Sequence, residues 1–264
     1  MDWRLIAEQP LDGATAMALD EVAAETVTDG GPATVRLYRW TPSTLTLGYG
    51  TDVDEIDATF CDDNGIDVTR RPTGGGAIYH DYSGDVAYSI IAPADAYPGD
   101  VTACYRQFCE PVVEAFDRVG VEVDFASTPA DAIHPPACYL RALDPAHDIT
   151  GPDGRKIAGN AQYRTRDAIV QHGSLTFDVD ATMHVNCFSA PQAPKTFRDR
   201  VGGVTDYADV DRSSFVDSLE SSLSTWADAE PGSWTDAERE RSHELVERKY
   251  GADEWILNRE PIVQ

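Results

Sequence analysis

The stretch RRPTGGGAIYH, residues 70–80, places two arginines, a proline and three consecutive glycines directly before a short apolar run that ends in histidine. Glycine backbone adopts conformations closed to other residues and lets a ligand lie against peptide N–H groups. Such a loop suits a phosphate, a carboxylate or an adenylate. The same glycines are also compatible with a tight turn that binds nothing. The stretch matches neither the dinucleotide fingerprint GxGxxG nor a P-loop, because no GK[ST] follows it.

The composition predicts an acidic globular protein. The chain has 264 residues, 42% of them hydrophobic, and a formal net charge of −25. This charge disfavours binding to nucleic acid or to anionic membrane surfaces. Acidic residues are spread along the whole chain, as solubility at very high salt requires, so we expect a halophilic source. We find no signal peptide and no apolar run of about 18 residues, and therefore expect a cytoplasmic protein.

The five cysteines do not indicate a metal or disulfide framework. Their number is odd and none forms a CxxC pair. No HExxH, His-Cys cluster or paired-carboxylate spacing is present either, so the sequence predicts no metal site.

Hydrophobic periodicity predicts strands and helices in irregular order rather than as repeated βαβ units. The predicted fold is α+β, a mixed β-sheet core flanked by helices, in one domain over residues 1–264 with a helical C-terminal portion at about 207–264. We expect strands at 3–6, 35–40, 43–50, 67–70, 85–93, 121–125, 155–164 and 168–177. The strands at 35–40 and 43–50 would form a hairpin, and the strand at 155–164 would return from a hairpin turn at Gly151 to Gly154. We expect helices at 14–27, 54–64, 101–119 and 213–226, and another after the capping box Thr235-x-x-Glu238.

A second motif is GRKIAGNAQ, residues 154–162, which places Lys156 on a predicted strand among small residues. Small neighbours leave room for a ligand beside the lysine stem, and an ammonium there would stabilise an oxyanion or an acyl phosphate. A lone lysine on a strand usually points to solvent, so both interpretations remain open. Lysine is scarce in this chain, which raises the weight of the functional one.

The third motif is QHGS, residues 171–174, where His172 precedes Gly173 in an apolar strand. A histidine in this position is more often a hydrogen-bonded core residue than a catalyst. His80 is similar, and with Asp81 after it, anchoring the glycine loop is its simplest role.

The order of these motifs resembles the lipoate-protein ligase and octanoyltransferase family, relatives of the biotin-protein ligases. The resemblance also covers MALDE at 17–21, VRLYRWTPSTLTLGYG at 35–50 and KYGADEW at 249–255. It implies a biotin/lipoate protein ligase-like catalytic domain that joins a lipoyl or octanoyl group, by an amide bond, to a lysine of a lipoyl domain. The acceptors would be lipoyl domains of 2-oxoacid dehydrogenase complexes or the glycine cleavage H protein, and the acyl substrates lipoate or octanoate.

The resemblance also implies roles for individual residues. Lys156 would hold the carboxyl oxygen during activation and transfer. The activated end of the ligand would lie against the arginine and glycine loop, and the strands around Tyr79, Tyr88 and His172 would line the acyl tunnel. The full set of implied binding residues is Arg70, Arg71, Gly74, Gly75, Gly76, Ala77, Tyr79, His80, Gly159, His172 and Gly173.

The family divides by the way the carboxyl group is activated. Ligases use ATP and Mg²⁺ and pass through an acyl-adenylate, whereas transferases take octanoyl from an acyl carrier protein, one group of them through a cysteine thioester. GGGAIYHD resembles the ligases, because the cysteine transferases tend to have a bulky residue at the third glycine. Cys138, in HPPACYLRALD, lies where those transferases place their nucleophile, and the ligases' Arg-Asn-Asp element is not found there; a small buried loop residue is the alternative for Cys138.

We therefore predict an ATP-dependent lipoate-protein ligase, with the Cys138 octanoyltransferase as the alternative. A ligase of this length would work with a separate accessory subunit, and a transferase with an acyl carrier protein. A family member that only binds lipoylated proteins is a third hypothesis, which the glycine run together with Lys156 disfavours. Biotin ligation is a fourth, and the contexts of QHGS and RRPTGGG fit lipoate enzymes better.

Overall fold

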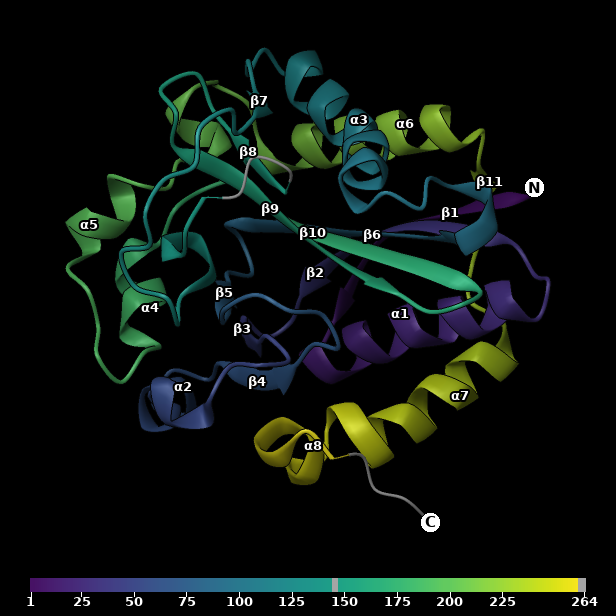
Figure 1. Ribbon diagram of the computed structural model, residues 1–264, viewed down its shortest axis with the longest axis horizontal. Helices are drawn as coiled ribbons and strands as arrows, with labels where there is room; N and C mark the ends of the chain where they lie inside the picture. Colours follow the sequence, from purple (N-terminus) through teal and green to yellow (C-terminus); the bar gives the residue numbers. More distant parts are fainter. Residues whose placement is uncertain (144–146, 261–264) are drawn as a thin grey trace.

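A computed structural model describes residues 1–143 and 147–260 (Figure 1). Its strands are β1 (Trp3–Leu11), β2 (Ala33–Trp40), β3 (Thr44–Leu47), β4 (Asp67–Arg70), β5 (Ile78–His80), β6 (Asp85–Pro93), β7 (Asp124–Phe125), β8 (Asp148–Thr150), β9 (Lys156–Arg164), β10 (Ala168–Thr176) and β11 (Glu230–Pro231). Its α-helices are α1 (Gly13–Thr28), α2 (Ala58–Asp63), α3 (Val101–Arg118), α4 (Ala181–Asn186), α5 (Pro194–Arg198), α6 (Arg212–Ala227), α7 (Asp236–Leu245) and α8 (Asp253–Asn258).

The described strands form two sheets. The larger has eight strands in the order β11-β1-β2-β6-β10-β9-β8-β7, and the smaller has three in the order β4-β3-β5. In the larger sheet β1 runs parallel to β2 and β11, while the remaining neighbours are antiparallel. This confirms the predicted α+β class with a mixed sheet, because parallel and antiparallel pairs share one sheet.

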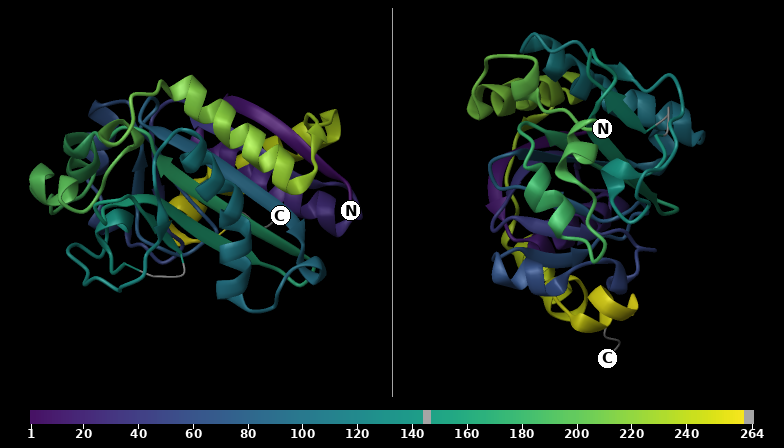
Figure 2. Two further views of the ribbon diagram at one scale, coloured as in Figure 1. Left: turned by 90° about the horizontal axis from the view of Figure 1, so that it is seen from above. Right: turned by 90° about the vertical axis from the view of Figure 1, so that its left-hand side faces the viewer.

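Helices cover both faces of the larger sheet. Figures 1 and 2 show α3 and α6 on one face and α1 with α7 on the other. The amphipathic helix α3 buries Phe108, Val112 and Phe116 against strand residues such as Tyr88 and Ile90. On the opposite face α1 packs Met17 against Tyr38 and Trp40 of β2. The sheet is thus the middle layer, as expected for a single core of this kind.

The predicted hairpin of strands 35–40 and 43–50 is wrong. Strand β2 pairs with β1 and β6 in the large sheet, whereas β3 pairs with β4 and β5 in the small one. Both edges of β2 are already occupied, so the turn at Pro42 carries the chain from one sheet to the other. Local alternation identifies a strand but not its partner.

Several boundaries also differ from the predicted ones. β1 continues to Leu11, past an irregularity between Ile6 and Gln9, because its second half also pairs with β2. The predicted helix 54–64 divides into a 3-10 turn, Val53–Glu55, and α2, whose N-cap Asp57 accepts from the Phe60 amide. The predicted strand 121–125 shortens to β7.

The C-terminal portion is mostly helical, but β11 joins the large sheet beside β1. The predicted capping box forms at Thr235 and Glu238 and begins α7. Within the described residues, no helix combines the length and apolar character needed to cross a membrane.

Candidate active site

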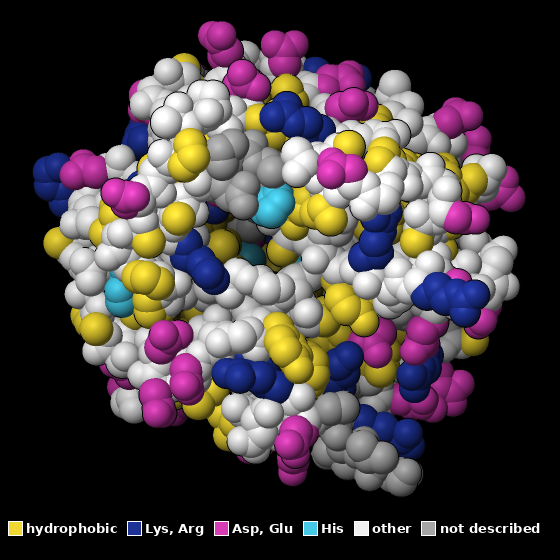
Figure 3. Space-filling view, viewed as in Figure 1, with side chains coloured by type: hydrophobic (Ala, Val, Ile, Leu, Met, Phe, Trp, Pro, Cys, Tyr) yellow, Lys and Arg dark blue, Asp and Glu magenta, His cyan; other side chains and the backbone are white. Residues whose placement is uncertain are grey.

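A cavity of about 650 Å³ opens at the free side of β9 and is bordered by the glycine loop, the loop carrying Cys138 and the first turns of α1. The space-filling view shows a hollow near the middle of this face, with hydrophobic and histidine side chains at its border (Figure 3). Among the predicted site residues, those that line it are Arg71, Gly74, Gly75, His80, Cys138, Lys156, Gly159, His172 and Gly173.

Arg71 shapes the glycine loop from inside. It is 5% exposed, and its guanidinium donates to the carbonyl oxygens of Gly74 (3.0 Å) and Gly76 (2.8 Å). The same group donates to the carbonyl and the hydroxyl of Thr46 at 2.9 and 2.8 Å. The loop carbonyls therefore face Arg71, and this arginine, predicted to hold a ligand, primarily fixes the backbone against which a ligand would lie.

The geometry requires glycine at two positions, Gly75 in the loop and Gly48 next to it. Gly75 has φ +98°, a left-handed conformation that side chains other than glycine rarely adopt. Gly48 lies directly behind it, because a Cβ on Gly48 would come within 2.1 Å of the Gly75 carbonyl oxygen. The LGYG segment at residues 47–50 can therefore pack directly against the glycine run.

Cys138 is held against the end of the glycine loop by main-chain hydrogen bonds. The Ala77 amide donates to Pro136 O and the Cys138 amide donates to Ala77 O, both at 2.7 Å. A Cβ on Gly76 would lie 2.5 Å from Pro136 O and 2.9 Å from the Cys138 nitrogen. Gly76 and Ala77 therefore do not line the cavity. They pack against the Cys138 segment and hold it in position.

Lys156 begins β9 and is 5% exposed. Its ammonium forms an ion pair with Asp148 of β8 and lies 4.9 Å from the centre of the Tyr139 ring. Burial disfavours the charged form, but the Asp148 carboxylate and the nearby Cys138 sulfur raise the pKa of Lys156 above its usual range. The cavity therefore contains a fixed positive charge beside Cys138.

The side chain of Lys156 passes over Gly159 to reach Asp148. Gly159 stands opposite Asp148 in the β8–β9 ladder. A Cβ on Gly159 would lie 3.1 Å from Lys156 Cε and 3.3 Å from Nζ. Any larger residue would press on the end of the lysine side chain. This contact explains why the GRKIAGNAQ motif has glycine at position 159.

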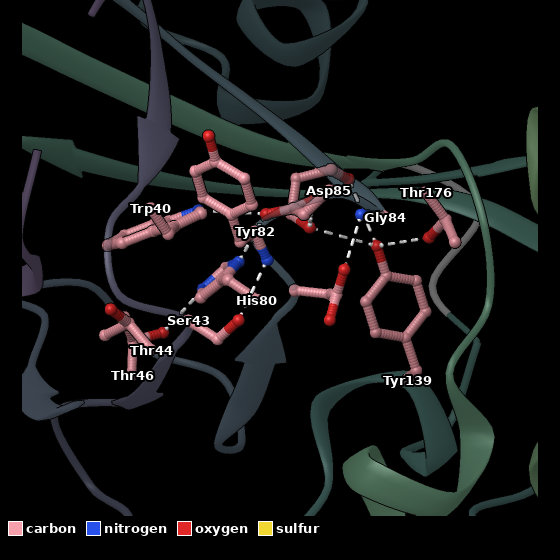
Figure 4. Close-up of polar contacts among 12 residues, drawn as sticks. Trp40, Ser43, Thr44, Thr46, His80, Tyr82, Gly84, Asp85, Tyr139 and Thr176 are labelled. Atoms are coloured by element: carbon pink, nitrogen blue, oxygen red, sulfur yellow. Dashed lines mark hydrogen bonds and ion pairs between the residues drawn. The ribbon is translucent and has the colours of Figure 1, made fainter. Parts of the chain in front are cut away.

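Tyr139, next to Cys138, belongs to a buried hydrogen-bond network, part of which Figure 4 shows. Its hydroxyl donates to Ser174 O at 3.1 Å and accepts from Thr176 Oγ1 at 3.2 Å. The Ser174 hydroxyl donates to Asp85 Oδ1 at 2.6 Å. Asp85 Oδ2 in turn pairs with His80 Nδ1 at 2.7 Å.

His80 uses both ring nitrogens within the protein. Its Nε2 lies 2.9 Å from Thr46 Oγ1, the hydroxyl that also accepts from Arg71, and its ring stacks on Trp40 with centroids 4.1 Å apart. Burial lowers the pKa of His80 despite the opposing charge of Asp85, so the imidazole is neutral near pH 7. The anchoring role expected for His80 fits these contacts.

His172 is likewise anchored while its ring forms part of the cavity wall. Nε2 lies 2.8 Å from Thr73 Oγ1, and Nδ1 lies 3.1 Å from Asp20 Oδ2. Asp20 also pairs with Arg36, which is 1% exposed. This series of contacts ties β10 to α1 and to the residue just before the glycines.

Arg70 lies away from the cavity, although the resemblance implied that it holds the ligand. Its guanidinium is fully buried and donates to the carbonyls of Gly48, Tyr49 and Thr51 and of Ile256 in α8, at 2.8 to 3.1 Å. Burial, with Arg259 nearby, lowers the pKa of Arg70 to about 10. Its position fits a structural role that joins the C-terminal helix to the base of the glycine loop.

Tyr79 and Tyr88 are outside the lining residues too. Strand alternation turns Ile78 and His80 toward the cavity and Tyr79 away from it, where its hydroxyl donates to Asp81 at 3.0 Å. Tyr88 lies beneath Gly173, its cross-strand partner, and donates to Asn160 Oδ1 at 2.6 Å.

The sequence interpretation missed Asp148, Tyr139, Asp20 and Thr73. Asp20 lies within MALDE and Thr73 within RRPTGGG, so both stood in motifs already quoted. Asp148 begins the short strand β8, whose hairpin partner β9 carries Lys156, and the turn expected at Gly151 to Gly154 was the available signal. Nothing local marks Tyr139 except its position after Cys138.

The chain is similar to known proteins along nearly all of its length. A family model described as the lipoyl protein ligase A/B catalytic domain matches residues 12–224. The octanoyltransferase LipM of Halalkalibacterium halodurans is 31% identical to it, covering 96% of this chain and 98% of that one. A lipoate-protein ligase A bound with ATP aligns with a TM-score of 0.82 and 27% identity, over 97% of this chain and 99% of that chain.

A third match comes from Thermoplasma acidophilum. The structure of its archaeal lipoylation system, a bipartite lipoate protein ligase and its E2 lipoyl domain, aligns with a TM-score of 0.81 and 26% identity over 100% of both chains. Fold, cavity and matches together define a catalytic domain of the class that attaches lipoyl-type acyl groups to proteins. The chain belongs to the lipoyl protein ligase A/B catalytic domain family.

Proposed function

We propose that this protein is an octanoyltransferase that takes an octanoyl group from an acyl carrier protein and passes it, through a thioester on Cys138, to a lysine of a lipoyl domain. The observation that carries the proposal is the position of Cys138 in one cavity with Lys156 and the glycine loop. The other four cysteines are buried, whereas Cys138 is partly exposed. A nucleophile needs this access, and a cysteine used only for packing does not.

Two cationic side chains lie near Cys138. The charge of its sulfur acts to raise the pKa of both Lys156 and Arg71, so both side chains are close to it. Burial still holds the pKa of Arg71 below its usual range, although the guanidinium remains charged near pH 7. A thiolate beside fixed positive charge is the form that attacks a carbonyl carbon.

The proposed reaction has two transfers. In the first, the Cys138 thiolate attacks the octanoyl carbonyl carbon, the carbonyl oxygen becomes an oxyanion near the Lys156 ammonium, and the carrier thiol leaves as a thiolate. In the second, the neutral amine of the acceptor lysine attacks the Cys138 thioester. An amide bond forms, the carbon–sulfur bond breaks, and the amine proton leaves to solvent while Cys138 returns to a thiolate.

The relatives support the transferase over the predicted ligase. The proteins at 31% identity from Halalkalibacterium halodurans and Geobacillus kaustophilus are named octanoyltransferase LipM. The third glycine, which had favoured ATP, has another explanation, because Gly76 must be small for the Cys138 segment to pack against it. Gly76 therefore favours a ligase less than the sequence alone indicated.

An ATP-dependent ligase is the second candidate, and the extensive similarity to a ligase bound with ATP favours it. In that case the backbone at Gly74 and Gly75, together with Lys156, would hold the phosphate end of an adenylate. Mg²⁺ typically binds through one or two carboxylates plus substrate phosphates, and among the described lining residues Asp148 supplies a carboxylate. ATP and Mg²⁺ would supply the activation that a carrier thioester supplies in the transferase.

The acceptor is proposed to be a lipoyl domain under either candidate. The archaeal ligase with similar structure was solved as part of a system with its E2 lipoyl domain. Such a domain must present its lysine to the cavity opening, where Cys138 is accessible. An acyl carrier protein, or for a ligase a separate accessory subunit, would be the second protein partner.

The test is intact-mass analysis of an apo lipoyl domain incubated with the protein under two conditions. One reaction contains octanoyl carrier protein without ATP, and the other contains lipoate or octanoate with Mg-ATP. We expect octanoylation in the first alone, and its loss in Cys138→Ser. Modification only in the second, unaffected by Cys138→Ser, would overturn the transferase and establish the ligase.

A further inference from the structure

The cavity extends around the free edge of β9 to both faces of the sheet. On one face it is lined by Met17 of α1 and by His172, whose ring is bonded to Asp20 of α1 at 3.1 Å. On the other it is lined by Tyr105 of α3 and by Gln162, whose amide donates to Cys104 of α3 at 3.4 Å. The two parts are called the α1 lobe and the α3 lobe here.

The alternation of residues in β9 gives the two lobes different chemistry. The sequence GNAQ at 159–162 places Gly159 and Ala161 toward one face and Asn160 and Gln162 toward the other. The α1 lobe is bordered by Met17, Tyr38, Trp40 and Ile78, which suits a hydrocarbon chain.

The α3 lobe combines amide side chains with a flat aromatic surface. The rings of Tyr105 and His147 stack with centroids 4.0 Å apart and an interplanar angle of 29°. Asn160 donates through its amide to His147 O at 3.0 Å, which fixes the amide beside this ring pair. Gln162 donates through its amide to Gln171 Oε1 at 3.2 Å.

The backbone of β9 adds further hydrogen-bonding groups to this lobe. Strand β8 covers β9 only from Lys156 to Gly159, and among the described residues no strand pairs with that edge beyond Gly159. A free strand edge presents N–H and C=O groups that an extended amide chain can pair with. Asn160, Ala161 and Gln162 of this free edge line the cavity.

We propose that the α3 lobe binds the thiol-bearing arm of the acyl donor, an uncharged chain with amide groups of the pantetheine class. The inference rests on the proposed octanoyl transfer and adds the site at which the donor is recognised. A thioester carbonyl at Cys138 carries two chains that must leave it in different directions. The acyl chain fits the apolar α1 lobe, and the amide-bearing arm fits the α3 lobe with its amide groups, ring pair and strand edge.

The proposal predicts that the contribution of the arm can be measured separately from the chemistry. Acylation of Cys138 is followed by intact mass with two small donors, S-octanoyl pantetheine and the short thioester S-octanoyl thioglycolate. Both deliver the same acyl group, but only the first has amides. We expect the wild-type protein to prefer S-octanoyl pantetheine in kcat/KM for acylation.

Gln162→Leu removes an amide from the lobe with little change in volume. We expect the ratio of kcat/KM for the two donors to fall about fivefold, the effect of losing roughly one hydrogen bond. Gln107→Leu, the same change on α3 at a residue outside the cavity lining, is the matched control and should keep the wild-type ratio.

Ala142→Trp is a second variant for the case in which Gln162→Leu does not fold. Ala142 is exposed and lines the cavity, so a bulky side chain there would narrow the cavity without disturbing the core. It should reduce the use of S-octanoyl pantetheine more than that of the short thioester. Equal losses with both donors, or an unchanged ratio in both variants, would overturn the assignment of the arm to this lobe.

The same experiment separates this inference from the proposed function. Acylation of wild-type Cys138 by either thioester supports the transferase whatever the ratio in the variants. Failure of both donors to acylate the wild-type protein, with lipoyl-domain modification from Mg-ATP and octanoate, would contradict the transferase and the arm site together.

Discussion

Lys156 and Asp148 form a buried ion pair between the adjacent strands β9 and β8, with Gly159 leaving the space in which they meet. The pair keeps a positive charge in a cavity where burial alone would favour a neutral amine. The lysine predicted from its small neighbours is therefore an ammonium whose charge depends on a carboxylate that the sequence interpretation did not identify.

Asp148→Asn should lower the upper pH limit of acyl transfer. Without the carboxylate, burial lowers the pKa of Lys156, so the ammonium is lost as pH rises through a lower value than in the wild type. In the wild type the pKa of Lys156 is raised, so the ammonium stays charged at pH values above the ordinary lysine pKa of about 10.4. The pH profile of kcat/KM measures this shift. Asp153→Asn, which removes the carboxylate paired with Arg155 in the β8–β9 turn, is the control and should leave the profile in place.

Gly76→Ala and Gly74→Ala should differ sharply although the two glycines are almost neighbours. A Cβ at 76 would collide with the Pro136 carbonyl and the Cys138 amide, whereas a Cβ at 74 would meet no atom within 4 Å. We expect Gly76→Ala to reduce acylation of Cys138 by about a hundredfold, as a displacement of about 1 Å can do. Similar rates in both variants, measured by intact mass over time, would contradict the packing of Cys138 on this loop.

Arg70→Met should destabilise the protein without a specific effect on substrate affinity. The change removes the Arg70 donor from four backbone carbonyls, of which Gly48 O keeps the Thr51 amide and Thr51 O keeps Arg259. The loss of these hydrogen bonds costs about 3 kcal/mol in the free energy of unfolding. Urea unfolding measures the loss, and Arg166→Met in the exposed turn between β9 and β10 is the control. A stable Arg70→Met protein with a large rise in KM would instead place Arg70 at the ligand.

Glu238 should contribute to stability at neutral pH and lose that contribution in acid. Hydrogen bonds from Arg4, Thr235 and Thr26 outweigh burial and lower the pKa of Glu238 from 4.5 to about 2. The folded state thus binds its proton less readily than the unfolded chain, so the stabilisation is lost as pH falls through this range.

The measurement for Glu238 is the difference in urea midpoint between the wild type and Glu238→Gln at pH 7 and at pH 3. The difference should be large at pH 7 and smaller at pH 3. Glu114→Gln, which removes an exposed pair with Arg118, should change the midpoint little at either pH. An equal effect of Glu238→Gln at both pH values would contradict the assigned pKa.

Much of the fold was predictable because local patterns specify local structure. The central strand β6, the helix α3 and the capping box of α7 follow from continuous apolar runs, a 3.6-residue period and a side-chain to backbone hydrogen bond. The failed hairpin has the opposite cause. Whether β2 and β3 pair depends on β1 and β6 occupying the edges of β2, and those strands are distant in sequence.

The candidate site shows the same division. Lys156 and the glycines were identified from their motifs, and Cys138 from the family resemblance; of these residues all but Gly76 line one cavity. Which of Arg70 and Arg71 faces the cavity was not predictable, because Arg70 bonds to Ile256 of α8, which lies 186 residues later in the sequence. Tyr79 was misplaced because strand alternation gives two faces but does not tell which one meets the cavity.

The central claim is that Cys138 carries the acyl group. The most direct measurement is the intact mass of the protein after brief incubation with octanoyl carrier protein and acid quenching, followed in a second sample by addition of an apo lipoyl domain. We predict one octanoyl adduct, absent in Cys138→Ser, that disappears as the lipoyl domain gains the same mass. An unmodified protein, with octanoylation of the lipoyl domain only when octanoate and Mg-ATP are supplied, would contradict the account.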